Sequence, residues 1–143
     1  MEKVKDQDRS TLYYSDDIWA FFQNCWHLKD WIKNDPMLLN NVRNSIEKEV
    51  EKYDSLMICA DLTNRSKHSE LKFKIRKDAK ITGIGVTVHA PPIITSTSEP
   101  KEEGYVEHPF YIMISDGNKF DGLRIAIQAV DDWKKILGTF SLL

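Results

Sequence analysis

The residues best suited to chemistry lie close together in one stretch of the 143-residue chain. Asp61, Asn64, Arg65 and His68 recur at offsets of three, four and seven, which places them on one face of a helix. Lys67 stands beside them as a further cation. A polar face of this kind is either a buried hydrogen-bond network or a binding or catalytic site.

Cleavage of RNA without metal is the chemistry that these side chains could perform. It requires a histidine that moves a proton and a cation that holds the phosphate in the transition state. His68 could supply the first group, and Arg65 or Lys67 the second. We therefore take His68, Arg65 and Asn64 as catalytic candidates and Lys67 as a binding candidate.

The same residues also fit a structural interpretation. Asp61 and Asn64 would bind buried hydrogen-bond donors, because buried polar groups are nearly always paired. His68 would lie at a helix end, where the dipole favours its positive form, and Arg65 would be solvated. Both interpretations stay open at the level of the sequence.

A second polar pair lies on the predicted first helix. His27 and Asp30 stand three residues apart, so their side chains are neighbours on a helix. If this helix packs antiparallel to the one that carries Asp61, the two sets meet at one level of a bundle. His27, Asp30 and Asp61 are therefore binding candidates, although His27 and Asp30 also fit a purely structural hydrogen-bond pair.

Several classes of site are missing from the sequence. It contains no glycine-rich phosphate loop, no GxSxG elbow, no HExxH motif and no calcium-loop carboxylates. The four histidines are scattered, and Cys25 and Cys59 have no CxxC partner, so no metal and no cofactor is predicted. The formal net charge of −2 excludes a surface devoted wholly to nucleic acid but leaves room for a local basic patch.

The cellular compartment is predicted from the apolar segments and from the two cysteines. No run of apolar residues suits a signal peptide or a membrane span. Both cysteines lie among apolar helical neighbours, as small core residues do in a reducing compartment. We therefore expect a cytoplasmic protein that has no membrane partner.

Helical spacing of apolar residues predicts the elements that position these side chains. The first helix is expected to begin at Ser15, a capping residue followed by two aspartates, after a loosely held N-terminal arm over residues 1–14. Trp19, Trp26 and Trp31 cover its other faces, which indicates a second contact with another subunit.

The next segment, residues 36–69, also has helical spacing. Asp35 and Pro36 suit a cap and a first helical residue. The pattern fits either one long helix or two helices broken near Asp54 and Ser55.

After Ser69 the spacing of apolar residues changes to a period of two. Strands are expected at 71–76, 81–88 and 110–114, with a tight turn at Asp116-Gly117 and a long surface loop over 91–108. A last amphipathic helix is expected to start at the cap residue Asp121 and to stop at Gly138.

Together these elements predict an α+β fold, a mostly helical bundle with a small antiparallel β-sheet inserted before the C-terminal helix. The length suits a single domain over residues 1–143. Its parts are the arm 1–14, the helical part 15–69, the β-sheet part 70–116 with the loop 91–108, and the C-terminal helix 121–138.

Two segments of the sequence, residues 22–32 and 61–68, together resemble a known group of proteins. This group consists of uncharacterised bacterial proteins, some associated with mobile elements, that are loosely similar to the HEPN (higher eukaryotes and prokaryotes nucleotide-binding) helical domains. The resemblance implies a dimeric helical domain and, in active members, metal-independent RNA cleavage in toxin–antitoxin or phage-defence systems. His68 matches the histidine of the family's motif, whereas Arg65 stands closer to it than the motif's arginine does.

Two functions follow from these interpretations. The first is an HEPN-like ribonuclease or RNA-binding protein, a homodimer with RNA and an antitoxin-like protein as partners. The second is a non-catalytic homodimeric protein–protein interaction module with a structural polar network, in which the tryptophan-rich helix forms the dimer or docks a partner.

Overall fold

The computed structural model describes residues 2–67, 76–84, 87–89, 105–107 and 110–143, and the side chains of residues 15–65, 76–82 and 110–143. Its helices are α1 (Glu2–Asn34), α2 (Asn40–Val50), α3 (Asp54–Lys67) and α4 (Gly122–Thr139). Its strands are β1 (Lys80–Ile84), β2 (Thr87–His89), β3 (Tyr105–Glu107), β4 (Phe110–Met113) and β5 (Lys119–Asp121).

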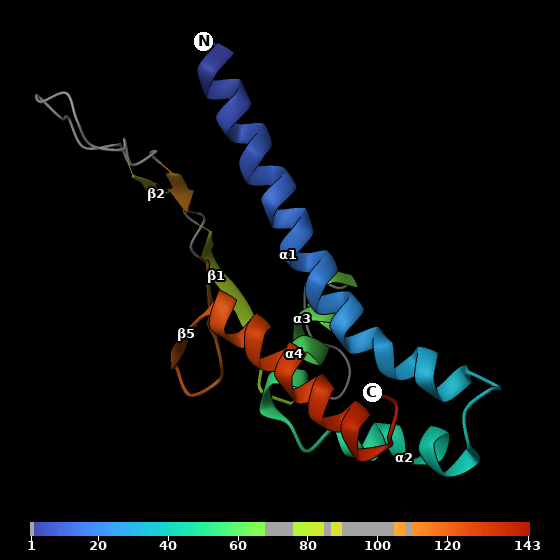
Figure 1. Ribbon diagram of the computed structural model, residues 1–143. Helices are drawn as coiled ribbons and strands as arrows, with labels where there is room; N and C mark the ends of the chain where they lie inside the picture. The colour runs from blue at the N-terminus through green and yellow to red at the C-terminus, as the bar shows by residue number, and fades with distance from the viewer. Residues whose placement is uncertain (1, 68–75, 85–86, 90–104, 108–109) are drawn as a thin grey trace, which may run out of the picture.

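The strands form two antiparallel sheets between α3 and α4. One sheet has the order β1-β4-β5, and β2 pairs with β3 in a separate two-stranded sheet. Figure 1 shows the hairpin of β2 and β3 extending away from the packed helices. The predicted α+β fold, mostly helical with a small sheet before the last helix, is confirmed.

The start of the first helix differs from the prediction. The helix begins at Glu2 and not at Ser15, so the backbone of the expected arm is helical. Residues 2–14 contain neither proline nor glycine, and the Ser15 pattern favours a helix start without preventing a helix from passing through it. In Figure 1 this N-terminal part of α1 reaches beyond the other helices.

The described part of the segment 36–69 contains two helices, α2 and α3, with a break at residues 51–53. The expected helix start after Asp35 is wrong, because α2 begins at Asn40. Asp35 turns the chain instead, since its Oδ1 accepts a hydrogen bond from the N–H of Met37 at 2.8 Å. Val42, Ile46 and Val50 then form the buried stripe of α2.

The predicted strand over 81–88 is divided between the two sheets. Its first part lies in β1, which pairs with β4 and has an irregular register between Thr82 and Ile84. Its second part lies in β2, and the partner of β2 is β3, which falls inside the predicted loop 91–108. The loop prediction is therefore wrong at residues 105–107, while residues 71–75, 90–104 and 108 lie outside the described residues.

The turn after β4 is confirmed at Asp116-Gly117. Gly117 has φ of +83°, a backbone conformation that side chains disfavour, and its N–H donates to the carbonyl of Ile114 at 3.0 Å. The turn leads into β5, which the sequence did not predict. All three residues of β5 are exposed, so it lacks the alternation by which strands are recognised.

Helix α4 begins where the sequence predicts. The side chain of Asp121 caps it by accepting from the N–H of Leu123 at 3.2 Å. Gly122 packs directly under the Phe110 ring, and a methyl group at this position would overlap that ring. Phe110 and Gly122 therefore fix the start of α4 against β4.

The core lies where α1, α3 and α4 meet, with β4 closing one end. Its fully buried side chains include Phe22, Leu56, Leu62, Ile112 and Ile136. Helices α1 and α3 approach closely enough for the hydroxyl of Thr63 to lie 3.4 Å from the carbonyl oxygen of Phe22.

Candidate functional site

Asp61 is fully buried in α3, and its carboxylate binds the backbone that leads into the sheet. Oδ1 accepts from the N–H of Arg76 at 3.1 Å, and Oδ2 accepts from the N–H groups of Lys77 at 2.6 Å and Ala79 at 3.3 Å. Three amide donors on one carboxylate are the contacts that the structural interpretation predicts.

Arg65 lies one turn further along α3 and holds the same backbone segment. Its Nε donates to the carbonyl of Ala79 at 2.7 Å, and its Nη2 forms an ion pair with Asp78. Asp78 has φ of 52°, in the left-handed region that non-glycine residues rarely adopt. Arg65 is therefore not the solvated cation of the structural interpretation, because it fixes an unusual backbone conformation.

The other candidates from this helix lie toward its end. Asn64 is half-buried, and Lys67 is the last residue of α3. The side chain of Lys67 and all of His68 lie outside the described residues. The catalytic role of His68, and its approach to Arg65 and Asn64, therefore stay predictions.

His27 and Asp30 form a hydrogen-bonded pair on α1. The Nδ1 atom of His27 lies 3.1 Å from Oδ2 of Asp30, and Nζ of Lys29 donates to Oδ1 at 2.7 Å. Partial burial raises the pKa of the Asp30 carboxyl, but the hydrogen bonds from Lys29 and His27 lower this pKa overall. These contacts stay on α1, whereas those of Asp61 go to residues 76–79, so no described contact joins the two sets.

Trp26 is buried between two cations. Nζ of Lys29 lies 4.7 Å from the ring centroid, and the guanidinium carbon of Arg76 lies 4.8 Å from it. They share a hollow of about 260 Å³ with Glu47 and Glu51, and Glu51 lies 3.9 Å from Arg76. Lys48 also lines this hollow. Because Glu47 of α2 lies 3.8 Å from Lys29 and Glu51 pairs with Arg76, both cations beside Trp26 are engaged in contacts between elements, and we assign this hollow to the packing of α1 against α2.

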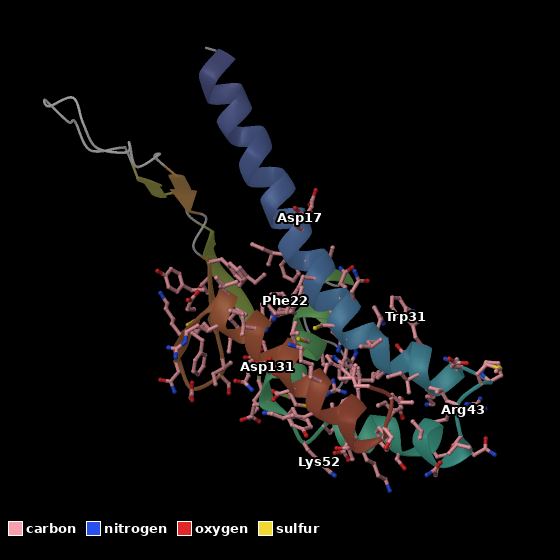
Figure 2. All side chains as sticks on the ribbon, in the orientation of Figure 1. Asp17, Phe22, Trp31, Arg43, Lys52 and Asp131 are labelled. Atoms are coloured by element: carbon pink, nitrogen blue, oxygen red, sulfur yellow. The ribbon has the colours of Figure 1, made fainter. Side chains whose placement is uncertain are left out.

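A larger apolar groove runs between α1 and α4. We call it the α1–α4 groove, and it consists of two adjoining cavities of about 440 and 410 Å³ that share Phe21, Val130 and Lys134. The first lies toward β4 and ends at Asp17 and Leu123. The second ends at Trp31 and Leu137. Figure 2 shows Asp17 and Trp31 along α1 and Asp131 on α4.

Large apolar side chains along this groove are exposed to solvent. Trp31 is 63% exposed, Leu123 is 59% exposed and Ile127 is 54% exposed. These values are high for residues that stand on helices beside a core. Exposed apolar side chains that gather along a groove mark a surface for another molecule.

The sequence signal for this groove was present on α4 but was interpreted differently. Leu123, Ile127, Val130 and Trp133 are apolar residues of the amphipathic helix that the sequence predicts after Asp121. In the structure Trp133 is buried with Ala129 and Ile136, while Leu123, Ile127 and Val130 are exposed. The apolar stripe of α4 is therefore too wide for one core contact.

Asp132 is a buried carboxylate that joins α4 to α3. Its Oδ2 accepts from the hydroxyl of Ser55 at 2.7 Å, and its Oδ1 accepts from Gln128 at 2.8 Å and Lys135 at 3.1 Å. Burial raises the pKa of Asp132, but the hydrogen bonds from Ser55, Gln128 and Lys135 lower this pKa overall. Its charged form therefore stabilises the contact between the two helices.

Metal-binding clusters and membrane-spanning helices were both searched for in the structure. Within the described ranges, no cluster of three or more histidine, cysteine, aspartate or glutamate side chains could hold a metal ion. Nor does any helix in that part of the chain have the length and apolar character needed to cross a membrane.

Comparisons with known proteins leave the family unassigned. No protein-family model, no curated protein and no solved structure matches the chain. The likeness to HEPN domains therefore stays a prediction from residues 22–32 and 61–68.

Proposed function

We propose that the chain is a protein–protein interaction module that binds a second copy of itself through the α1–α4 groove. The observation that carries this proposal is the exposure of Trp31, Leu123 and Ile127 along a continuous apolar groove. Removing such apolar side chains from water is the main favourable contribution to most protein–protein association.

The groove is suited to a second copy because its walls are apolar and its cation is already paired. Helices α1 and α4 run in the same direction along it, and Lys134, which lies where the two cavities meet, forms an ion pair with Asp131 at 3.7 Å. A two-fold axis in the plane of the contact would bring the apolar walls of two copies together without leaving Lys134 unpaired.

The ribonuclease hypothesis stays a second prediction. It requires His68, and of its proposed cations Arg65 already binds Ala79 and Asp78. Since no described contact favours phosphate binding, RNA cleavage enters here as an outcome of the experiments and not as the proposed activity.

The first experiment measures the mass of native protein and Ile127→Asp by sedimentation velocity over a wide range of concentration. We expect the native chain to associate and the variant to stay monomeric, because the substitution places a carboxylate in the apolar contact of both copies. A loss of about 1.4 kcal/mol in each copy already weakens the dimer about a hundredfold.

Met37→Asp is the matched control. Met37 is 89% exposed but lies in the turn between α1 and α2, outside the groove, so this variant should associate like the native chain. A native chain that is monomeric at every concentration overturns the proposal. Equal weakening by both variants would assign the association to a different surface.

Incubation with RNA in the absence of metal separates the two functions. The proposed module leaves the RNA intact. Cleavage that Ile127→Asp retains and His68→Ala loses would assign a nuclease activity to His68 and overturn the non-catalytic proposal.

A further inference from the structure

Helix α1 is longer than the core against which it packs. It runs from Glu2 to Asn34, and Ile18 is the first of its described side chains to be buried, after the exposed Asp16 and Asp17. Residues 2–14, which we call the α1 arm, reach beyond the other helices in Figure 1. The arm therefore leaves the packed body of the molecule close to Asp17.

A helical arm of this kind needs a surface to pack against. Because the arm continues a packed helix, it requires no nucleus of its own, but helices in proteins are stabilised mainly by burying one face. The sequence of the arm contains Val4, Leu12, Tyr13 and Tyr14 among charged residues of both signs. Burial of these four residues would stabilise the arm.

The α1–α4 groove begins where the arm ends, and the two have the same length. Asp17 lines the first cavity of the groove, and Trp31 lines the second. The stretch of α1 from Asp17 to Trp31 is about 21 Å long, and the arm, residues 2–14, is about 20 Å long. An arm that turned back along this groove would therefore cover it from one end to the other.

We propose that the α1 arm of each copy lies antiparallel along the α1–α4 groove of the other copy. This inference rests on the proposed self-association and adds which segment of the second copy fills the groove. A two-fold axis that crosses α1 near Asp16, in the plane of the contact, produces the arrangement, because it reverses the direction of the arm over the partner. The first cavities of the two copies then meet close to the axis.

The apolar positions of the arm are matched to the groove in this arrangement. Positions at equal distances on either side of the axis stand level with each other, so position 4 is level with Leu28 of the partner subunit and position 14 with the partner subunit's Ile18. Ile18 lines the first cavity and Leu28 the second. Residues 2–9 include three acidic and three basic side chains, so the arm brings no net side-chain charge to the contact.

A proline in the middle of the arm tests the proposal. Ser10→Pro breaks the helix within the arm, because proline removes a backbone hydrogen bond and clashes with the preceding turn. The body of the fold stays intact, since the buried part of α1 begins at Ile18. We expect the Kd of self-association, measured by sedimentation velocity, to rise at least about tenfold.

Lys3→Pro is the matched control. Helix α1 begins at Glu2, so this proline falls in the first turn, where a helix tolerates it, and the variant should associate like the native chain. If Ser10→Pro associates as tightly as the native chain while Ile127→Asp stays monomeric, the role of the arm is overturned and the groove contact stands. A native chain that is monomeric at every concentration overturns both proposals.

A photo-crosslinker at position 12 locates the arm without breaking the helix. Unlabelled protein that carries benzoylphenylalanine in place of Leu12 is mixed with isotopically labelled native protein, irradiated, digested and analysed by mass spectrometry. We expect cross-links from the unlabelled arm to labelled peptides that contain residues of the α1–α4 groove. Cross-links within one chain only, or to labelled peptides from outside the groove, overturn the proposal.

Discussion

The role of Asp61 can be tested by one substitution that keeps its shape. In Asp61→Asn, the amide oxygen can replace only one of the two carboxylate oxygens, and the NH₂ group then faces a backbone N–H donor. The native carboxylate accepts from three N–H groups, those of Arg76, Lys77 and Ala79, at 3.1, 2.6 and 3.3 Å. At least one of these amides therefore loses its acceptor.

The expected loss of stability follows from these contacts. A hydrogen bond to a charged group contributes about 1.5 to 3 kcal/mol, and an amide left without an acceptor in a buried site adds a cost of its own. We expect Asp61→Asn to lower the free energy of unfolding by about 3 kcal/mol. A chain of this length should then melt roughly 10 °C lower.

Equilibrium unfolding in urea, followed by tryptophan fluorescence, measures this loss. Asp54→Asn is the matched control on the same helix, because Asp54 is 82% exposed and its ion pair with Lys77 contributes at most about 1 kcal/mol. An Asp61→Asn variant as stable as the native chain would refute the structural assignment. Such a result, together with altered RNA binding, would instead favour a site on this face of α3.

Three further predictions concern α4 and the α1–α4 groove. Asp132→Asn should lower stability at neutral pH by about 2 kcal/mol. Because folding depresses the pKa of Asp132, its contribution is present above the unfolded pKa near 4 and is lost as the pH falls through the folded value. Urea titrations between neutral pH and acid should therefore show the difference between variant and native chain shrinking below about pH 4, and a constant difference would contradict the pKa assignment. Gly122→Ala should destabilise the fold by at least about 1 kcal/mol, because the new methyl group overlaps the Phe110 ring, whereas Gly138→Ala has open space and should change stability little in the same assay. Trp31→Ala should weaken self-association by roughly 2 kcal/mol per copy, about a thousandfold in Kd, with folded stability unchanged in thermal melts of the dilute chain. A Kd within threefold of the native value would remove Trp31 from the contact.

The helices were predictable because their signals are local. Asp121 caps α4 as expected, and the break before Asp54 was one of two alternatives that the pattern allowed. The start of α1 was misplaced because Ser15 is a good cap inside a segment that contains no residue able to end a helix. A capping residue marks where a helix can begin and does not require it to begin there.

The contacts of the candidate site depended on distant segments and could not be predicted in detail. The polar face of α3 was identified, but its partners are backbone amides of residues 76–79, and backbone groups leave no sequence pattern. The pair of His27 and Asp30 was predictable because both residues lie on one helix. Its separation from Asp61 was not, because it depends on which faces of α1 and α3 meet.

The β-sheet was only partly predictable for a similar reason. Strand β5 carries no buried residue, so alternation could not reveal it. Strand β2 continues the predicted strand 81–88, but its partner β3 lies inside the predicted loop and is recognised only by their pairing. The α1–α4 groove was not predicted, because the spacing of apolar residues on α4 does not show which of them face the core and which face solvent. Only the packed structure shows that Leu123, Ile127 and Val130 lie outside the core.

The backbone contacts of Asp61 have a consequence for how β1 is positioned. Because the carboxylate binds the amides of Arg76, Lys77 and Ala79, α3 itself fixes the path of the chain into β1. The register of β1 against β4 is therefore supported both by strand pairing and by one carboxylate on a helix. In related chains, we expect an acidic residue to be retained at the position of Asp61.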